Sequence, residues 1–530
     1  MLSRHSTLLS TKPFQQEMLA RQAWPRAGPA NVFMIATCVI LMLNSVHGAF
    51  CTPNSGTCWP DRPTLNTWIS TLSGATSVWL WDKTPDKFLS ASVTMNALKT
   101  NFPGIIVAPV SEKDLRSALA FALTYKIRVV TKCSGHDYNG RSNGRGVMMI
   151  RMEKLNFVEY NPDDETVMFM SGATHEDVYS ALADANRVFV GAPSKSVCPA
   201  GCLAGGCHGL FSRQYGLGIE SILEIRLMLY NGTIITATRN SYVDLFHAYL
   251  GAGQNSFGVA VSFRARTYPA PQQILRLEVS LHLHNPQLSG ATYPNIFSDY
   301  IFNVRWFNSM PNELSGMLLV ENDVVYIRFF YTGGDYVGAF NALQPLLNSP
   351  YRRSVDPIVN YTSILDVVRH LQPDSSELFS RSFLANAFVP PQQAMLNDLS
   401  LIIGETQPPM LLWFMFGGAV RSGSVGSVPA GMRSAMYEAL FSDKWFDPSE
   451  DELRMEYVST TYLPTLYNFG NSSCNNEYTT WGNLYNVLGD WKTRFFGDYS
   501  SLLRTKKKYD PCNYFTVKLG VASDLPSATC

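Results

Sequence analysis

Apolar and polar positions follow a regular order from residue 105 onward. Residues 105–110 read IIVAPV and residues 127–130 read IRVV, and short apolar runs of this kind are typical of buried strands. Between them, leucine and alanine recur at helical spacing after Ser111 and Asp114, which resemble a capping box. This order of strand, helix and strand predicts a compact βαβ unit.

The same order returns further along the chain. Residues 166–170 (TVMFM) and 187–190 (RVFV) predict strands, and a helix is expected between them over residues 174–185. Residues 191–218 are then rich in glycine. Each glycine in a helix costs about 1 kcal/mol relative to alanine, so a helix is disfavoured there.

Residues 270–460 form a separate stretch with another pattern. Before it, β-rich runs flank Asn231 and Gly232, a pair typical of a tight hairpin. Within it, residues 274–283 and 324–331 alternate as strands do, and helical segments lie between such strands. This stretch therefore predicts an antiparallel sheet covered by helices on one side.

The amino terminus carries one apolar run, at residues 32–43, preceded by Arg21 and Arg26 and followed by small residues. This run is too short to cross a bilayer, which needs about 20 helical residues. The pattern predicts a secretory signal peptide over residues 1–48, and hence a secreted, extracellular protein. A signal-anchor and a later translation start remain alternatives, because the lead before the apolar run is unusually long.

Composition limits the classes of partner. Hydrophobic residues make up 46% of the chain and charged residues 16%, which excludes a disordered or coiled-coil protein. Lysine and arginine total 42, as do aspartate and glutamate, so no basic field is expected to bind nucleic acid or a membrane surface. The only short charge run, residues 506–508, is expected to be a solvated helix end. A small molecule or a neutral polymer is the expected substrate.

The chain has ten cysteines, of which Cys38 would leave with the signal peptide. Secretion exposes the others to an oxidising compartment, so disulfides are expected. Cys51 and Cys58 bracket a turn-rich stretch and predict a local bridge. The remaining odd number leaves at least one thiol free or otherwise engaged. Sequons at Asn231, Asn360 and Asn471 are glycosylation acceptors if the chain is secreted.

A metal site is the alternative interpretation of one cysteine cluster. Cys198, Cys202 and Cys207 lie close to His208 in sequence. Their spacing fits no common zinc pattern, and secretion favours disulfides, so no metal is expected.

Three loops of small residues follow predicted strands. They cover residues 132–142, 201–209 and 251–259. Small side chains let backbone N–H groups approach a phosphate or a ring, so together the loops suit a large planar cofactor with a pyrophosphate. None of the loops has the GxGxxG spacing of a Rossmann turn.

Four motifs, in the right order, resemble one family. Residues 134–142 are similar to the pattern GGH-[SD]-Y-x-G-x-S, and residues 205–217 are similar to GGG-[HY]-G followed by a Tyr-Gly-Leu stretch. Residues 244–259 are similar to DLF-W-A-x-x-G-x-G-x-x-N-F-G-V, and residues 508–515 to a closing K-Y-DP-x-N-x-F. The chain thus resembles the FAD-linked oxidases of the vanillyl-alcohol oxidase type, and within them the berberine bridge enzyme-like family.

The resemblance implies an α+β fold. A two-lobed, PCMH-type FAD-binding domain is expected over residues 101–268, after residues 49–100 that pack on it. A substrate domain, with an antiparallel sheet covered by helices, is expected over residues 269–460. Residues 461–530 are expected to return to the FAD domain as a berberine-bridge-like segment. The substrate would lie between the sheet and the flavin ring.

The resemblance also implies covalent attachment of FAD. It places the bond to the 8α position of the flavin at His136. Without the other motifs, His136 would be expected to be an ordinary histidine in a turn. A second bond, from a cysteine to flavin C6, is not expected, because Ser194 occupies that position and Cys198 lies four residues later. The residues that the resemblance places against FAD are Ser134, Gly135, His136, Asp137, Tyr138, Gly140, Ser142, Gly201, Gly205, Gly206, His208, Gly209, Gly258, Val259 and Asn513.

Catalytic residues are less clear from the motifs. Tyr138 and Tyr467 are the candidates; Tyr138 would either share a proton with the substrate or pack on the ring. The position of the family's glutamate or glutamine base falls on Leu440, which cannot accept a proton. Glu438 would share the face of Leu440 only if that segment is a strand. Val197 is expected near flavin C4a, which favours an oxidase.

The expected function is the oxidation of an alcohol, in a carbohydrate or a secondary metabolite, with FAD reoxidised by O2 to give H2O2. A flavin dehydrogenase with another acceptor and a non-catalytic flavin-bound defence glycoprotein remain alternatives, as does a disulfide protein without cofactor. The sequence does not identify the oligomeric state or the exact substrate.

Overall fold

The computed structural model describes most of the chain after residue 58. The described ranges are 59–282, 299–300, 303–321, 324–334, 336–371, 381–389, 410–462 and 491–525. The chain divides into two units, Met1–Cys58 and Trp59–Cys530, and the described ranges all belong to the second. The signal peptide, the Cys51–Cys58 bridge, Asn471 and Tyr467 lie outside them. Among the described helices, none is long and apolar enough to cross a membrane.

The first lobe is built on a four-stranded sheet in the order β1-β2-β4-β3. Its strands are β1 (Ser77–Trp79), β2 (Ile105–Ala108), β3 (Val129–Lys132) and β4 (Met148–Arg151), and its helices are α3 (Arg62–Ser70), α4 (Pro85–Ser92) and α5 (Glu112–Thr124). The predicted strand, helix and strand are present, and Ser111 caps α5 by accepting a hydrogen bond from the Asp114 backbone. However, β2 and β3 do not pair with each other, because the fully buried β4 lies between them and pairs in parallel with both.

The second lobe is built on a five-stranded antiparallel sheet in the order β5-β6-β10-β8-β9. The strands are β5 (Val158–Asn161), β6 (Thr166–Met170), β8 (Ile222–Met228), β9 (Ile234–Thr238) and β10 (Val259–Arg266), with helices α6 (His175–Ala183) and α9 (Val243–Ala252). The predicted hairpin is confirmed: β8 and β9 pair across Asn231 and Gly232, and Gly232 has a φ of 79°.

The second predicted βαβ unit is wrong in its pairing. β7 (Arg187–Val188) leaves the sheet of β6 and pairs with β11 (Tyr268–Pro269) in a separate ribbon. The reason is burial: Val188 and Val190 pack into a different apolar cluster, with residues such as Phe330.

The glycine-rich segment also differs from expectation, because it contains two short helices. These are α7 (Pro199–Leu203) and α8 (Ser212–Tyr215), followed by the 3-10 turn η2 (Gly218–Ser221). Most of the glycines lie between the helices rather than inside them, and Pro199 starts α7 at a position that needs no N–H donor.

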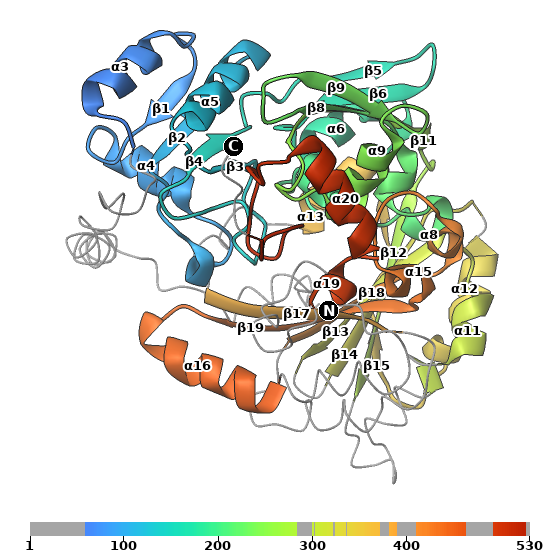
Figure 1. Cartoon of the computed structure of the whole chain (residues 1–530). Helices are drawn as coiled ribbons and strands as arrows, with labels where there is room; N and C mark the ends of the chain where they lie inside the picture. The colour runs from blue at the N-terminus through green and yellow to red at the C-terminus, as the bar shows by residue number, and fades with distance from the viewer. Residues whose placement is uncertain are drawn as a thin grey trace, which may run out of the picture. The chain divides into compact units, whose positions relative to one another are not determined.

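The rest of the chain forms an eight-stranded antiparallel sheet. Its order is β15-β12-β14-β13-β18-β19-β17, with β16 paired to β12. The strands are β12 (Ile274–His282), β13 (Leu314–Glu321), β14 (Val324–Tyr331), β15 (Arg352–Val355), β16 (Val359–Tyr361), β17 (Arg381–Val389), β18 (Met410–Met415) and β19 (Tyr437–Trp445). The helices of this part are α11 (Val304–Ser309), α12 (Tyr336–Leu347), α13 (Ile364–Leu371), α15 (Ala430–Ser434) and α16 (Asp451–Tyr457). In Figure 1 most of this sheet, including β13, β14, β17 and β19, lies below the two lobes.

The two faces of this sheet have different neighbours. On β19, the ring of Tyr437 packs against Phe307 of α11, with centroids 5.2 Å apart, so this face is the one that the helices cover. Glu438 points to the opposite face because side chains alternate along a strand. That face meets the glycine-rich segment of the second lobe, as described below.

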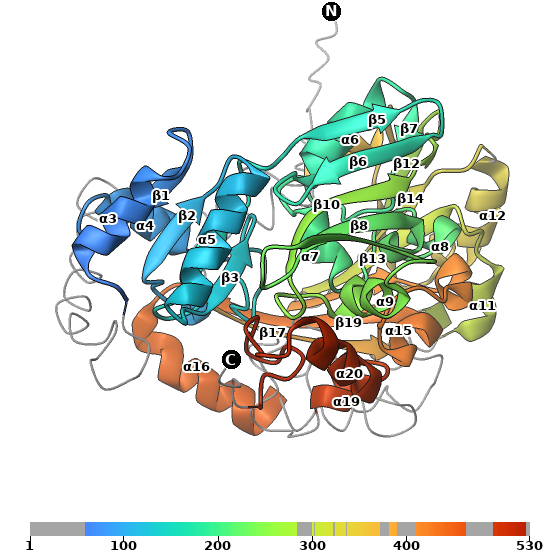
Figure 2. The same ribbon diagram turned by 45° about the horizontal axis from the view of Figure 1, so that its top comes forward.

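The last helices, α19 (Trp491–Phe495) and α20 (Tyr499–Tyr509), bring the tail back to the second lobe. Lys508 and Tyr509 contact Asp244 of α9, and α20 lies beside α9 in both views (Figures 1 and 2). Lys506 corrects the expectation of a solvated helix end. Its side chain is 1% exposed, and its Nζ lies 2.6 Å from Asp510 Oδ2 and donates to the carbonyl oxygen of Ser256.

Candidate functional site

The first predicted cofactor loop is a rigid turn after β3. Gly135 and Gly140 have φ values of 87° and 73°, which favour glycine. A Cβ at Gly140 would lie 2.8 Å from Cβ of Lys99. Asp137 holds the turn by accepting hydrogen bonds from the backbone of Asn139 and Arg141, and its carboxylate pairs with the Arg141 guanidinium at 2.9 Å. The turn is therefore preorganised without any ligand.

His136 projects from this turn toward the segment before α7. Its Nε2 lies 2.9 Å from Oγ of Ser196, and a disulfide joins Cys133 to Cys198 across the same two segments. Because Cys198 is bonded to Cys133, its sulfur is not available for another covalent bond in this state. Neither the sequence spacing nor the motifs indicated this pairing.

The segment that faces His136 is itself held by a buried histidine, His175. Nδ1 of His175 lies 2.8 Å from the carbonyl oxygen of Val197, and its Nε2 accepts a hydrogen bond from Ala192 N–H at 3.0 Å. This pattern requires the neutral ring, protonated at Nδ1. Burial lowers the pKa of His175 from 6.5 to about 4, so the ring is neutral near pH 7.

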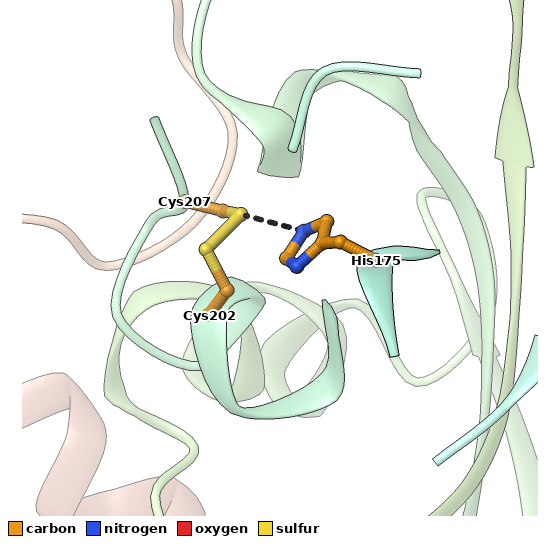
Figure 3. Close-up of side chains that lie close together, drawn as sticks. All are labelled: His175, Cys202 and Cys207. Atoms are coloured by element: carbon orange, nitrogen blue, oxygen red, sulfur yellow. Dashed lines mark hydrogen bonds between the residues drawn. A yellow bond between two sulfur atoms is a disulfide. The ribbon is translucent and has the colours of Figure 1, made fainter. Parts of the chain in front are cut away.

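His175 also lies beside the second disulfide, Cys202–Cys207 (Figure 3). Nε2 of His175 is 4.0 Å from Sγ of Cys207, and the nitrogen and both sulfur atoms lie within 4.8 Å of one another. Metal ligation requires thiolates, which the two bonded sulfur atoms do not provide. The histidine in this cluster is His175, whereas the sequence suggested His208.

His208 instead reaches the eight-stranded sheet. Its Nε2 lies 2.7 Å from Oε2 of Glu438 on β19. The segment is a strand, so Glu438 does share its face with Leu440, as the sequence argument required. Phe414 and Phe416 flank the His208 ring, with centroids at 5.3 and 5.1 Å. The pair joins the second lobe to the sheet at a point that is mostly closed to solvent.

Polar side chains join the third motif to the first one and to the carboxy-terminal helix. Asn255 accepts from Thr131 N–H at 2.8 Å and donates to the Arg141 carbonyl, and Gln254 accepts from Arg141 at 2.7 Å. Lys506 binds the carbonyl of Ser256. The sequence motif contained these residues, but gave no signal that they hold the turn rather than a ligand.

The predicted cofactor residues thus fall in four places. Ser134 through Ser142 lie on the turn after β3; Gly201 through Gly209 lie on α7 and the turn after it; Gly258 and Val259 lie at the start of β10; Asn513 follows α20. Tyr138 lies on the first turn, where its carbonyl accepts from Asn96. The turn after β3 contacts the segment before β10 directly. It contacts α7 through the Cys133–Cys198 disulfide.

Two of these residues carry buried oxygen atoms that still need a partner. Oγ of Ser142 and Oδ1 of Asn513 are buried without a hydrogen bond in the described part of the chain. Buried polar atoms are normally satisfied, so these oxygens indicate that a polar group belongs beside them. Together with turns closed to Cβ atoms, they fit a cofactor with hydroxyl and phosphate groups.

Comparison with known proteins agrees with a site for such a cofactor. Residues 103–238 match the family described as FAD binding domain, and residues 467–522 match the family described as berberine and berberine like. A VAO-type flavoprotein oxidase, VAO615 of Thermothelomyces thermophilus, is 26% identical over 470 residues, which cover 80% of this chain and 77% of that protein. Berberine bridge enzyme-like 22 of Arabidopsis thaliana is 24% identical, covering 80% of this chain and 86% of that protein.

A solved structure shares the fold. The glucooligosaccharide oxidase from Acremonium strictum, described with a 6-S-cysteinyl, 8α-N1-histidyl FAD, superposes with a TM-score of 0.75 at 17% identity, covering 87% of this chain and 99% of that one. The expected α+β fold, with a two-lobed FAD-binding part and a helix-covered antiparallel sheet, is confirmed. The chain thus carries an FAD-binding domain and a berberine-like segment, and its relatives are FAD-linked oxidoreductases that include a VAO-type flavoprotein oxidase and a berberine bridge enzyme-like protein.

Proposed function

We propose that this chain is a secreted oxidase that removes hydrogen from an alcohol group of a carbohydrate or a secondary metabolite, with FAD covalently attached at His136 and O2 as the electron acceptor. The single observation that carries the proposal is the placement of His136. It stands on a rigid turn, is fixed through Ser196, and lies where three cofactor motifs meet.

The residues of the four motifs would hold the cofactor. FAD, when bound, accepts the two electrons and the hydrogen that an alcohol carbon loses on oxidation. The turn after β3 would present backbone N–H groups, while Ser142 and Asn513 would offer their unsatisfied oxygens to polar groups of the cofactor. His175 would keep Val197 and Ser196 in place beside the flavin. Tyr138 remains a predicted catalytic or ring-packing residue, and Tyr467 remains a predicted catalytic residue.

Attachment through one bond follows from the cysteine pairing. The A. strictum oxidase carries both a histidyl and a cysteinyl link. In this chain Cys198 is engaged with Cys133, and Ser194 occupies the position expected for a linking cysteine. The disulfide joins the same two segments that a doubly linked flavin would hold together, so it would replace the second link as a brace.

Export is supported by the state of the cysteines. Two disulfides lie within the described residues, and Cys512 is disulfide-bonded as well. Such bonds persist in oxidising compartments and are rare in the cytosol. Asn231 and Asn360 are both exposed, as glycan acceptors need to be.

Mass spectrometry tests the attachment. Trypsin releases residues 133–141 between Lys132 and Arg141, and after reduction this peptide should carry the mass of FAD. His136→Ala should remove the added mass, whereas His282→Ala, at the end of β12, should retain it. An unmodified peptide from yellow wild-type protein would refute the covalent bond.

Anaerobic mixing tests the reaction. Cellobiose, maltose, lactose, xylobiose, chitobiose and a set of simple alcohols are mixed with the holoenzyme, and bleaching of the flavin band is followed. At least one sugar should bleach it, and air should restore the colour with release of H2O2. Recovery only with an artificial acceptor would favour a dehydrogenase, and the absence of bleaching with every compound would favour a non-catalytic flavoprotein.

A further inference from the structure

We propose that His175, Cys202 and Cys207 bind one Zn²⁺ ion when the disulfide between the two cysteines is opened. The three ligands come from neighbouring elements, because His175 begins α6, Cys202 lies in α7 and Cys207 lies in the turn after it. None of them is among the residues placed against FAD or substrate. The inference therefore stands apart from the proposed function.

The three ligand atoms lie close together in the oxidised chain. Nε2 of His175 is 4.0 Å from Sγ of Cys207, and the nitrogen and both sulfur atoms lie within 4.8 Å of one another. Figure 3 shows the imidazole turned toward the two sulfur atoms. Zn²⁺ binds sulfur at about 2.3 Å and imidazole nitrogen at about 2.0 Å, so its ligand atoms lie roughly 3.5–3.8 Å apart in a tetrahedral site. The cluster therefore reaches this spacing through small side-chain movements once the sulfur atoms are no longer bonded.

The hydrogen bonds of His175 prepare its ring for a metal ion. Nδ1 lies 2.8 Å from the carbonyl oxygen of Val197, which fixes the proton on that nitrogen and leaves the lone pair on Nε2. Zinc-bound histidines commonly donate their second N–H in this way, because the bond orients the ring and raises its basicity as a ligand. Nε2 accepts a hydrogen bond from Ala192 N–H at 3.0 Å, and the ion would take the place of that donor. Burial lowers the pKa of His175 to about 4, so the ring has no proton to lose before it binds.

The charge and the chemistry of the donor atoms select the ion. Two thiolates and a neutral imidazole balance the charge of Zn²⁺, which matters because His175 and Cys207 are buried and Cys202 is half-buried. Cu⁺ in the same place would leave one uncompensated negative charge. Among the residues that the structure describes, the cluster contains no carboxylate, so Ca²⁺ and Mg²⁺, which need oxygen ligands, do not fit it. Three protein ligands leave the fourth position of Zn²⁺ for water, as in other Cys₂His sites.

Reduction and metal binding form one balanced exchange. Two thiols of a reductant supply two electrons and two protons and become a disulfide, while the S–S bond breaks and Cys202 and Cys207 become thiols. A phosphine does the same with one water molecule and becomes its oxide. Zn²⁺ then displaces the two protons and binds the thiolates. Oxidation reverses the sequence and releases the ion, so a disulfide closes the turn in one state and Zn²⁺ closes it in the other.

The reduced state precedes the oxidised one in every copy of the chain. Cysteines leave the ribosome as thiols, and disulfides form afterwards in an oxidising compartment. Cys198 lies only four residues before Cys202 and is itself disulfide-bonded, so a wrong pair is within easy reach. Zn²⁺ at His175 would hold Cys202 and Cys207 together, and away from Cys133 and Cys198, until their own bond forms.

Metal binding to the reduced holoenzyme tests the site. Protein opened with tris(carboxyethyl)phosphine is titrated with Co²⁺, whose absorption at wavelengths beyond the flavin bands reports tetrahedral thiolate ligation, and Zn²⁺ is then added to displace it. Wild type should bind one more Zn²⁺ ion per chain than the double variant Cys202→Ser with Cys207→Ser. His175→Gln should bind that ion at least about 100-fold more weakly, because it loses a direct ligand.

Two matched controls keep the ligand set specific. Cys133→Ser with Cys198→Ser removes the neighbouring disulfide, and His208→Asn removes the imidazole that the sequence placed beside these cysteines. Both should bind Zn²⁺ as wild type does. Near-UV circular dichroism of each reduced protein, with and without Zn²⁺, checks that the native packing is retained.

An alkylation experiment needs no variant. Trypsin releases residues 196–213 between Lys195 and Arg213, and this peptide carries Cys198, Cys202 and Cys207 together. Reduced wild type is treated with iodoacetamide, and mass spectrometry locates the label on each cysteine. One equivalent of Zn²⁺ should slow labelling of Cys202 and Cys207 at least about fivefold and change that of Cys198 by less than about twofold, because a metal-bound thiolate is no longer a free nucleophile.

Four results would overturn the proposal. They are equal Zn²⁺ binding by wild type and by Cys202→Ser with Cys207→Ser, wild-type affinity in His175→Gln, and protection of Cys198 to the same extent as Cys202. The fourth is loss of the native near-UV circular dichroism when wild type is reduced in the presence of Zn²⁺, because the site requires the folded arrangement of α6 and α7.

Discussion

Two imidazoles lie next to Cys207 and have opposite surroundings. His175 is fully buried, and both its ring nitrogens are engaged by backbone groups of Ala192 and Val197. His208 is partly exposed and its partner is a carboxylate. Backbone partners of fixed polarity suit one neutral tautomer, whereas a carboxylate suits a ring nitrogen that carries a proton. The same side chain therefore holds a backbone segment in one place and joins the second lobe to the eight-stranded sheet in the other.

The largest expected difference between the two histidines is in the free energy of unfolding that each substitution costs. His175→Ala should lower the free energy of unfolding by about 3–5 kcal/mol, because it opens a buried cavity and leaves Val197 C=O and Ala192 N–H without partners. His208→Asn should cost about 1 kcal/mol, since asparagine can still donate to Glu438. Urea unfolding followed by tryptophan fluorescence measures both. Equal losses in the two variants would mean that the two histidines do not differ in what they contribute to stability.

A second prediction concerns acid. The pKa of His175 is about 4 in the folded protein and 6.5 in the unfolded chain. As pH falls, the unfolded chain therefore takes up the proton first. The stability that His175 contributes is complete above pH 6.5 and is lost between pH 6.5 and 4, by about 3 kcal/mol. His175→Gln should therefore lose about 3 kcal/mol less than wild type between pH 7 and pH 4 in urea titrations. Identical pH profiles would mean that His175 is not held neutral.

Removing the Cys202–Cys207 disulfide should have a smaller effect on stability than His175→Ala. Cys202→Ser with Cys207→Ser should cost about 2 kcal/mol, because the bond closes a short loop. Urea unfolding of the variant and of wild type measures this loss. The result contrary to this is a variant with the same free energy of unfolding as wild type, since the disulfide would then not stabilise the turn.

The smallest effect is expected at the start of the same segment. Gly201 lies in α7, and a Cβ there would meet nothing within 4 Å, so Gly201→Ala should raise stability by about 0.5–1 kcal/mol. Gly206→Ala is the matched control and should lower stability, because its φ is 109°. Flavin content is read in parallel. A full complement of flavin in Gly201→Ala would remove Gly201 from the predicted cofactor contacts, and a reduced one would retain it.

Much of the fold could be read from periodicity. Residues 166–170 and 324–331 match β6 and β14, because alternation and apolar runs report directly on local burial. The insertion of β4 between β2 and β3, and the departure of β7, could not be read in this way. Both depend on which distant strand offers the better partner, which is a property of the assembled core rather than of any local window.

The candidate site likewise has features that the sequence predicts and features that it does not. The turns around His136 were predicted because small residues at fixed offsets are a local requirement of close backbone approach. The Cys133–Cys198 bond and the His208–Glu438 pair were not, because each joins segments that only the tertiary fold brings together. Alignment placed the functional position at Leu440, and only the strand register shows that Glu438 faces the same way.

The clamp made by Lys506 has a consequence for the order of assembly. The carbonyl of Ser256 on the third cofactor turn is bound by a lysine that leaves the ribosome 250 residues later. During synthesis, the turn and its neighbour Asn255 are therefore present long before the side chain that completes their support. The support of this turn is therefore complete only after the carboxy-terminal segment has been made and has docked.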